Sequence, residues 1–496
     1  MPDYEVGDRL AKLRKAHGYS QYQLGVLLGL SDKAVSKWET GNAKPRLETL
    51  MKLAGILGVD VNEFLEEAKD SSKEDQDLAR KKQELWAKAE ARLKEMYGEN
   101  YPLSVRNRFM TEKNTLGSSD VIMLFETVGR LKKFAEMKHE VFAIRGLASC
   151  SFVAWLLGAT CINPLPAHYL CPKCHRISFR PDARCGWDLP DEKCDACGVT
   201  VVKDGHNLPF EICVCGTSDP LLSFECNISE QLFDKSWETV LEFLSPFYSF
   251  KRWERSVVRG KRQSSVPKLY LFPRREEIFD RLDRIPTIGD DEGWNYIGEV
   301  PSLILIPCRD RKGSWSSYPK KPQDLINLPA LNRALKFYVT EQEKERERFL
   351  QEHEGHPEVK IPALKIPQNL DKVSSFAELV DVICEITASY NAESPEALAE
   401  EIGAKSYSDL LWSREDLWHL VCRCSGLEGQ IAGIAGEIVY KTRTGRYARN
   451  LTEDDRRMFA QLNLPSWFAG FVSRTVYLFP RCHNISWALQ LLVMLG

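Results

Sequence analysis

Four cysteines in two pairs have the spacing in this chain that points most directly to chemistry. Two residues separate the members of each pair, and nineteen separate the pairs: Cys171, Cys174, Cys194 and Cys197. Two such turns can face each other and present four thiolates to one tetrahedral Zn²⁺ ion. Because a shell of four protein ligands leaves no position for a reacting water, we expect a structural ion and not a catalytic one.

Other possible ligands lie close to these pairs. His168, His175, His206 and Cys185 fall in the same stretch, and we interpret each as a packing or hydrogen-bonding residue. The alternative for the four cysteines themselves is that they are unrelated free thiols. Their paired spacing favours the metal site.

A second set of side chains could contact DNA. Four polar residues recur at the spacing of one helix face: Lys33, Ser36, Lys37 and Thr40. Val35 and Trp38 fall on the opposite face. Three leucines are expected beside them in a core: Leu24, Leu28 and Leu30. The outer face is short, polar and partly cationic, as a helix that enters a DNA groove requires.

The residues around this face predict two helices joined by a tight turn. Ser20 and Gln23 have the spacing of a capping box, which starts the first helix. Gly29 supplies the turn, Ser31 caps the second helix, and Gly41 ends it. The pattern therefore predicts a helix-turn-helix.

Charge is concentrated on this segment. Between Arg9 and Arg46 there are eight Lys and Arg against two acidic residues, whereas the whole chain has a net charge of −3. The chain is therefore not a nonspecific polycation, but one segment has the field that DNA phosphates attract. The alternative is a helical bundle that makes protein contacts.

Residues 4–66 resemble the phage-repressor (Cro/XRE) helix-turn-helix family. A second helical pair built on Leu50 and Leu53 fits the same pattern. The resemblance implies an all-α head of five helices and a homodimer on a two-fold site in double-stranded DNA. Arg14 and Glu39 occupy positions that pair in this family and tie the first helix to the recognition helix.

The same resemblance implies DNA contacts residue by residue. Gln21 is expected at a phosphate, and Asn42 and Lys44 at the DNA backbone. Four residues are expected at base edges: Asp32, Lys33, Ser36 and Lys37. Asp32 departs from the Gln-type residue common in the family, because a carboxylate can accept from cytosine but repels phosphate.

The rest of the 496 residues has room for several further domains. A charged stretch predicts a linker at 67–84. Helical patterning follows, with a Cys-, Pro- and Gly-rich stretch at 161–220 that favours loops and strands. Residues 232–372 form a divergent middle region, and residues 373–496 are largely helical. The expected fold class is multidomain, mainly α with α+β parts.

Blocks on both sides of the cysteines resemble the palm of PolC-type (C-family, polymerase III alpha) DNA polymerases. They are NPLPAHYLCPKC at 163–174, GWDLPDEKCDACG at 186–198 and KDGHNLPFE at 203–211. SFAELV at 375–380 and VYLFPRCHNISWAL at 476–489 resemble the fingers of that family. The resemblance implies a palm-like segment at 85–231, with a zinc ribbon at about 168–206, and a fingers-like region at 373–496.

The resemblance also places two catalytic aspartates of the family where this chain has Leu221 and Ser223. A polymerase palm needs carboxylates that hold Mg²⁺; leucine offers no ligand atom, and a serine hydroxyl is a poor substitute. Asp219 and Glu225 are nearby carboxylates, but both are out of register. The loop that cradles phosphates in the family corresponds to residues 145–151, where bulkier residues replace small polar ones.

Three hypotheses follow. The first is a transcriptional regulator with a DNA-binding head and a catalytically silent polymerase-derived body, used for dimerisation, DNA-backbone binding or ligand sensing. The second is a PolC-type DNA polymerase that retains nucleotidyltransferase activity with Mg²⁺. The third is an interaction protein that competes with the replicative polymerase for DNA or partners, as a component of the replisome.

Composition favours a cytoplasmic protein without a membrane partner. The N-terminus lacks the pattern of a signal peptide, and the apolar run at 151–162 is too short to span a bilayer. Most of the fifteen cysteines are irregularly spaced, which favours metal-bound and buried thiols in a reducing compartment. The basic stretch at 251–262 could contact nucleic acid or form a solvated face.

Overall fold

The chain divides into two compact units, Met1–Gln83 and Glu84–Gly496, each with a core of its own. The computed structural model describes residues 4–16, 19–28, 30–41, 43–45, 47–57, 59, 73–117, 121–138, 142–214, 223–229, 248–259, 262–273, 302–308, 322–352, 372–390, 392, 395–405, 410–426 and 432–495. In this part of the chain the fold is mainly helical with smaller sheets, in agreement with the expected fold class.

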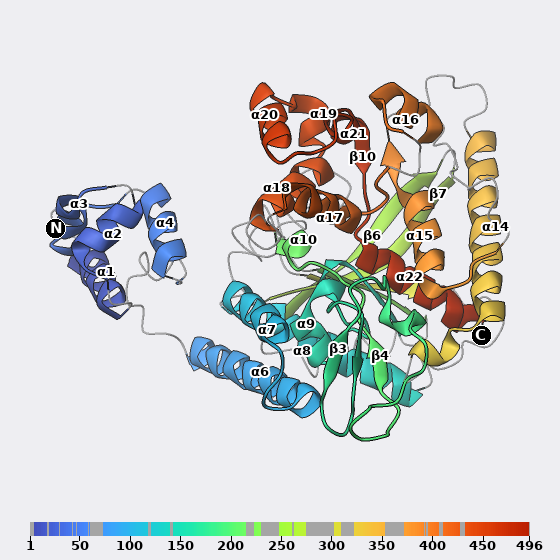
Figure 1. The fold of residues 1–496 in the computed structure, drawn as a ribbon, viewed down its shortest axis with the longest axis horizontal. Helices are drawn as coiled ribbons and strands as arrows, with labels where there is room; N and C mark the ends of the chain where they lie inside the picture. Colours follow the sequence, from blue (N-terminus) through green and yellow to red (C-terminus); the bar gives the residue numbers. More distant parts are fainter. Residues whose placement is uncertain are drawn as a thin grey trace. The chain divides into compact units, whose positions relative to one another are not determined.

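Four described helices form the head: α1 (Tyr4–Ala16), α2 (Gln21–Leu28), α3 (Asp32–Glu39) and α4 (Leu47–Leu57) (Figure 1). Val35 and Trp38 of α3 are buried in a core with Leu24 and Leu53, as the helix periodicity predicts. The prediction for Leu30 is wrong. It lies in the turn between α2 and α3, where 43% of its surface is exposed. The expected fifth helix lies outside the described residues.

The predicted capping box before α2 is present. The Ser20 hydroxyl accepts a hydrogen bond from the Gln23 N–H at 3.1 Å, and the Gln23 side chain accepts one from the Ser20 N–H at 2.8 Å. Ser31 precedes α3, but its hydroxyl makes no capping bond. The Asp32 carboxylate accepts from the Lys33 N–H instead, at 2.9 Å, and so satisfies one of the free donors of the first turn.

Three long helices follow the head: α6 (Lys73–Tyr97), α7 (Leu103–Leu116) and α8 (Val121–Lys138). Residues 73–84, which the sequence assigns to the charged linker, form the first part of α6. Beyond residue 84 the apolar positions of α6 become buried, beginning with Leu85, Trp86 and Ala89. The helix is therefore continuous where its composition changes from charged to amphipathic.

The second unit contains a five-stranded sheet in the order β1-β5-β8-β7-β6. The strands are β1 (Phe142–Arg145), β5 (Ser223–Ser229), β6 (Tyr248–Arg259), β7 (Arg262–Pro273) and β8 (Ser302–Cys308). Strands β5 and β8 are parallel, and the other neighbours are antiparallel. Phe125 of α8 meets Phe224 of β5 edge to face at 5.6 Å between ring centroids. Three strands, β6, β7 and β8, come from the middle region, 232–372, which therefore completes the sheet that β1 and β5 begin.

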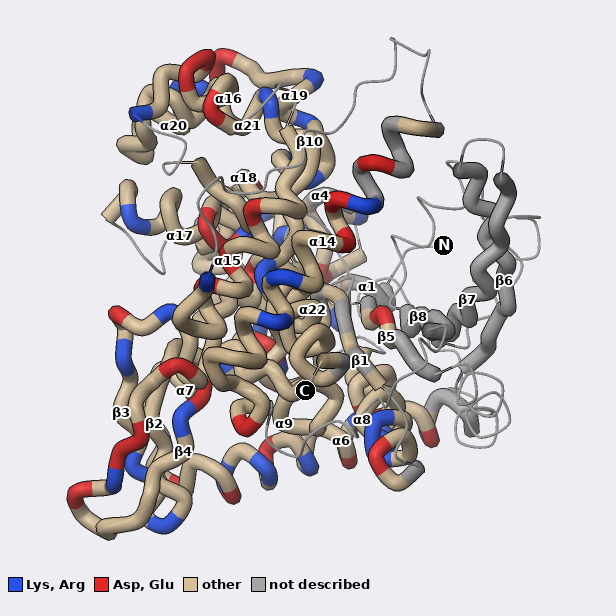
Figure 2. The backbone as a smooth tube through the Cα atoms, turned by 90° about the vertical axis from the view of Figure 1, so that its right-hand side faces the viewer, with Lys and Arg blue, Asp and Glu red and all other residues tan. Residues whose placement is uncertain are grey.

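A second sheet, in the order β3-β2-β4, carries the cysteine pairs. Its strands are β2 (His168–Leu170), β3 (Ile177–Phe179) and β4 (Val202–Asp204). Both outer strands run antiparallel to β2. One cysteine pair lies in the turn between β2 and β3, and the other lies between β3 and β4. Figure 2 shows Lys and Arg interspersed with Asp and Glu around these strands, so this surface is not of one charge.

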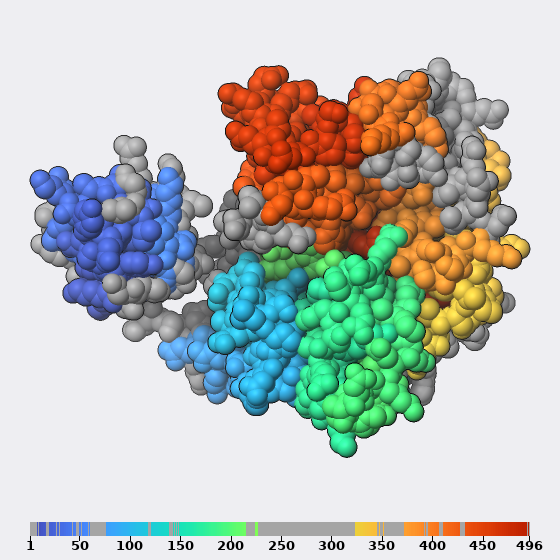
Figure 3. All heavy atoms as spheres, viewed as in Figure 1, coloured from blue at the N-terminus to red at the C-terminus, as the bar shows by residue number. Residues whose placement is uncertain are grey.

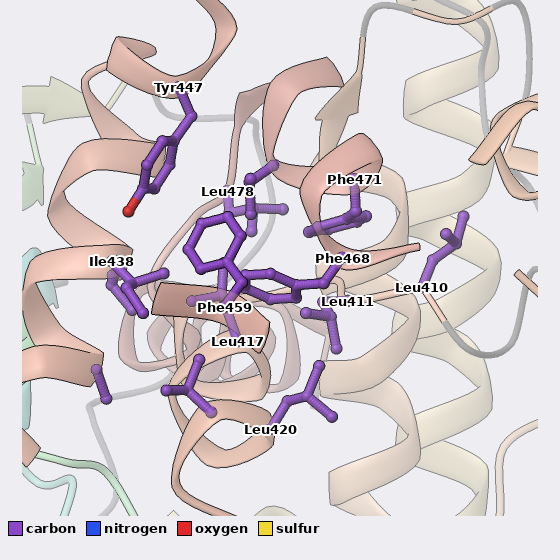
Figure 4. Packing of buried hydrophobic residues seen from close by; sticks show 14 of the residues in the cluster. Leu410, Leu411, Leu417, Leu420, Ile438, Tyr447, Phe459, Phe468, Phe471 and Leu478 are labelled. Atoms are coloured by element: carbon purple, nitrogen blue, oxygen red, sulfur yellow. The ribbon is translucent and has the colours of Figure 1, made fainter. Parts of the chain in front are cut away.

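The remainder of the second unit is mainly helical. Its longer helices are α14 (Leu328–Glu352), α15 (Phe376–Thr387), α16 (Pro395–Ile402), α17 (Arg414–Ser425), α18 (Ala432–Arg443), α20 (Glu453–Gln461) and α22 (Arg481–Leu495). Side chains of α17, α18, α20 and α21 (Phe468–Arg474) point toward one another in a large apolar cluster (Figure 4). Phe459 and Phe468 meet there edge to face, with ring centroids 5.0 Å apart.

Glu112 joins α7 to the short helix α9 (Phe152–Leu156). Its fully buried carboxylate accepts hydrogen bonds from Arg108 at 2.6 Å, from the Ser151 hydroxyl at 2.7 Å, and from the N–H groups of Phe152 and Val153 at 2.8 and 3.0 Å. A buried ionised carboxylate is stable only when such donors surround it. The start of α9 is therefore fixed against α7.

Among the described residues, none of the helices combines the length and hydropathy of a membrane span.

Candidate nucleic-acid interface and cysteine site

The outer face of α3 presents the side chains that the sequence predicts for DNA. Lys33, Lys37 and Thr40 are exposed, and Ser36 is half-buried. The Thr40 hydroxyl donates to the Ser36 carbonyl at 2.8 Å, which ties the end of the helix to its preceding turn. Two further predicted contacts, Asp32 and Lys44, are exposed, whereas Asn42 lies outside the described residues.

An ion pair fixes the end of α3 to α1. The Arg14 guanidinium donates to both carboxylate oxygens of Glu39, at 2.6 and 2.9 Å, and to the Tyr19 carbonyl at 2.6 Å. The side chains of Arg14 and Glu39 are only 9% and 6% exposed. This is the pair that the family resemblance predicts, and its burial distinguishes it from a weak surface ion pair.

Gln21 completes this network. Its amide nitrogen donates to Glu39 at 2.7 Å, a contact that the sequence analysis does not predict. Burial raises the pKa of Glu39, but the hydrogen bonds from Arg14 and Gln21 and the charge of Arg14 outweigh it and hold the pKa below the ordinary value. Glu39 is therefore ionised at neutral pH and connects α1, α2 and α3.

The structure brings the four predicted metal ligands together. The sulfur atoms of Cys171, Cys174, Cys194 and Cys197 all lie within 4.8 Å of one another, and those of Cys174 and Cys194 are 3.7 Å apart. A tetrahedral ion with Zn–S distances of about 2.3 Å would hold its sulfur ligands roughly 3.8 Å apart. The cluster therefore has the donor atoms and the size to hold a metal ion.

Short backbone hydrogen bonds shape the two turns. The Cys171 N–H donates to the Arg176 carbonyl at 2.9 Å, and the Gly198 N–H donates to the Cys194 carbonyl at 2.7 Å. Gly198 has a φ of +67°, a backbone conformation that favours glycine. The hydrogen bond from the Cys174 N–H to the Cys171 sulfur is the main cause that lowers the pKa of Cys171 to about 6.

The neighbouring histidines and Cys185 lie outside the cluster. His168 Nδ1 is 2.7 Å from the Pro166 carbonyl oxygen, and His206 Nδ1 is 3.6 Å from the Cys185 sulfur. The side chains of His168, His206 and Cys185 are buried. Burial lowers the pKa of His206 to about 3, so this ring is neutral at physiological pH. These residues have the packing and hydrogen-bonding roles that the sequence predicts.

Asp188 links the cysteine-bearing segment to the C-terminal helices. Its carboxylate accepts hydrogen bonds from the N–H groups of Phe376 and Ala377 at 2.7 and 2.8 Å, at the start of α15. A carboxylate at this position satisfies free N–H groups and complements the helix dipole. In Figure 3 the cysteine-bearing segment (green) lies directly against the segment that contains α15 (orange). Because 188 residues separate Asp188 from Phe376, no local sequence pattern indicates this contact.

Two of the four predicted palm positions can be described. Ser223 begins β5, and Glu225 lies opposite Arg145 of β1 in the antiparallel register. Leu221 and Asp219 lie outside the described residues. Within the described ranges, the cysteine cluster is the one group of three or more residues suited to hold a metal ion.

Cys150 and Cys213 form a disulfide that the sequence analysis does not predict. It joins η1 (Leu147–Cys150), in the loop that the resemblance assigns to phosphate binding, to α10 (Glu211–Val214). The expectation of buried thiols outside the metal cluster is therefore wrong for this pair. The two cysteines are 63 residues apart in the sequence, and no local pattern indicates that they pair, because only the folded chain brings them together.

The Glu39 carboxyl should make the stability of the head depend on pH. Its pKa lies below 4.5 in the folded head and returns to about 4.5 on unfolding, so its contribution is fully present above about pH 5. That contribution is lost as the pH falls through the folded pKa. Calorimetric melting between pH 7 and pH 3 should show this loss in the natural protein and a flatter profile in Glu39→Gln. Parallel profiles of the two proteins would contradict the assignment.

Comparison with known families gives two matches. Residues 10–64 match the model for a helix-turn-helix, and residues 83–214 match that for the bacterial DNA polymerase III alpha NTPase domain. The first match contains the whole of α3, and the second contains all four cysteines of the cluster.

Several PolC-type DNA polymerase III proteins are similar to this chain. The protein from Thermotoga petrophila is 25% identical over 79% of this chain and 32% of its own length. The protein from Clostridium perfringens is 24% identical over 80% of this chain and 30% of its own length. That from Bacillus cereus is 34% identical over 42% of this chain and 15% of its own length. The chain therefore spans about a third or less of the length of these relatives, and it joins a helix-turn-helix domain to a segment homologous to part of the PolC-type DNA polymerase III.

Proposed function

We propose that this protein binds specific DNA sequences as a transcriptional regulator and that its polymerase-derived body does not polymerise. The observation that supports this proposal best is the outer face of α3, which is polar while the opposite face is buried. The Arg14–Glu39–Gln21 network holds the end of this helix. Readout of base edges needs such a fixed helix, because the hydrogen bonds to bases are directional.

The DNA contacts of this proposal follow the positions of the side chains. Base edges would meet four residues of α3: Asp32, Lys33, Ser36 and Lys37. Gln21, Asn42 and Lys44 would contact the backbone. A glutamine amide has two N–H donors, so Gln21 can bond Glu39 with one and a phosphate oxygen with the other.

A homodimer belongs to the same proposal. Two copies of the head would bind half-sites about one helical turn, roughly 34–36 Å, apart on double-stranded DNA. The body would supply dimerisation or contacts with the DNA backbone, in the cytoplasm. A place in the replisome would be an additional role that pull-down against replisome proteins can test.

The body lacks the charged metal ligands that polymerisation needs at the positions that the resemblance indicates. Leu221 and Ser223 stand where the resemblance places metal-binding aspartates. Charged oxygen ligands hold the Mg²⁺ ions that stabilise the transition state of phosphoryl transfer, so their loss removes the main catalytic contribution. Homology to a polymerase does not itself establish activity.

The cysteine cluster would hold a structural Zn²⁺ ion through all four thiolates. Zinc prefers sulfur donors in tetrahedral geometry, and the spacing of the sulfur atoms fits that geometry. The ion would connect the β2–β3 turn to the segment before β4. Its effect would be stability and not catalysis.

Substitution of Lys37 tests the role of α3. Lys37→Ala should weaken binding to a selected operator by about 1–3 kcal/mol if the side chain reads a base. Electrophoretic mobility shift and fluorescence anisotropy with operator and random duplexes can measure this difference. Lys52→Ala, an exposed change on α4, is the matched control. Equal losses on the operator and on random DNA would show that Lys37 contacts phosphate only.

Metal analysis tests the cysteine site. The purified protein should contain about one zinc per chain, and the Cys171→Ser/Cys194→Ser variant should contain none. The body should then melt at a lower temperature while the helix-turn-helix keeps its own transition. Cys424→Ser, outside the cluster, is the control. Absence of zinc from the natural protein would refute the assignment.

Primer extension tests whether the body lacks polymerase activity. We expect no template-dependent extension with Mg²⁺ or Mn²⁺, because the positions of the metal-binding aspartates hold Leu221 and Ser223. The intact chain is incubated with a primed template and deoxynucleotides. Extension that is lost in an Asp219→Ala/Glu225→Ala variant would overturn the proposal and favour a polymerase.

A further inference from the structure

The outer face of α3 carries its side chains in two rows. Asp32 and Ser36 form one row, and Lys33 and Lys37 form the other, because residues four positions apart lie above one another on a helix. Neighbouring residues of a helix are turned by about 100° about its axis. In a major groove that holds α3, the two rows therefore face the two strands of the duplex.

The charged groups of both rows are available for bases. Asp32, Lys33 and Lys37 are exposed, and neither lysine side chain forms a hydrogen bond or ion pair with another described residue. Oδ1 of Asp32 accepts from the Lys33 N–H, and Oδ2 has no partner among the described residues. This face therefore offers the groove two cationic donors and one anionic acceptor.

The lysine row favours guanines on the strand that it faces. A lysine ammonium has donors and no acceptor, and only guanine presents two acceptors side by side in the major groove, O6 and N7. Adenine has its N7 acceptor beside an amino donor, and thymine has its O4 acceptor beside a methyl group. Lys33 and Lys37 are four residues apart, which is about 6 Å along the helix and roughly two base-pair steps of 3.4 Å.

The Asp32 carboxylate favours a cytosine on the other strand. An ionised carboxylate has acceptors only, so the acceptors of guanine and thymine repel it, whereas the N4 amino group of cytosine can donate to it. Adenine also has an amino donor, but its N7 acceptor lies beside that donor. Asn and Gln, the side chains that pair with both groups of adenine, are absent from α3. Because cytosine pairs with guanine, Asp32 and the lysines select the same orientation of a base pair.

We propose that the DNA half-site of this protein contains two or three consecutive G·C pairs with all guanines on one strand. Lys33 and Lys37 read the guanines, and Asp32 reads a cytosine of the opposite strand. This inference rests on the proposed function, because it requires α3 to lie in the major groove of DNA. It adds the class of base sequence that the helix selects, and it makes Asp32 a determinant of specificity.

Selection from a pool of random duplexes with the full-length protein tests this inference. The enriched duplexes should share such a run of G·C pairs. Replacement of one of these pairs by A·T should raise the Kd about fivefold or more in fluorescence anisotropy, which is the usual effect of one mismatched pair. Lys33→Ala and Lys37→Ala should each relax the preference at one guanine.

The Asp32→Asn variant changes the donors and acceptors at one position of the face. An asparagine amide can both accept from and donate to adenine, so this variant should select adenine where the natural protein selects cytosine. Its amide oxygen can still accept from the Lys33 N–H, so circular dichroism should show an unchanged fold. Lys52→Gln removes an exposed charge from α4 and should leave the selected sequence unchanged.

Two results would overturn the inference and leave specific DNA binding in place. The first is an enriched sequence with A·T pairs at the positions that Lys33→Ala and Lys37→Ala affect. The second is enrichment of the same sequence by Asp32→Asn and by the natural protein. Enrichment of no sequence at all would instead overturn the proposed function of α3.

Discussion

Glu112 has no exposed surface, and four donors surround its carboxylate. Transfer of an ionised carboxylate from water into a protein core costs far more than one ordinary hydrogen bond returns, so such a group must be fully bonded wherever it is buried. The donors around Glu112 come from its own helix and from residues about forty positions later. These hydrogen bonds fix the start of α9 against α7, and they thereby fix the loop that precedes α9.

The same constraint recurs where the structure positions its candidate sites. In the head, Glu39 is held by Arg14 and Gln21, and the three side chains join α1, α2 and α3 around a small apolar core. In the body, Asp188 closes the start of α15. Each carboxylate satisfies donors of another segment, and each therefore fixes the position of a helix.

The loop at 145–151 shows the combined effect of such contacts. Arg108, which Glu112 orients, donates to the Cys150 carbonyl at 2.6 Å and to the Leu208 carbonyl at 2.8 Å. The Cys150–Cys213 disulfide joins the same two segments covalently. In the homologous polymerases the sequence resemblance assigns this loop to the phosphates of the incoming nucleotide. Here two hydrogen bonds and a disulfide fix this loop to the segment that precedes α10 and to α10 itself.

The amino-acid sequence alone determined the features that depend on neighbours within a few residues. The paired cysteines, the capping box of Ser20 and Gln23 and the polar face of α3 all follow from short spacings and from the helical period, and the structure has each of them. The exposed position of Leu30, the strands contributed by the middle region, the disulfide and the bond from Asp188 to α15 were decided only by the tertiary structure. The strands, the disulfide and the bond from Asp188 have partners far along the chain, and the exposure of Leu30 depends on how one turn packs. No local periodicity indicates which distant groups a fold will bring together.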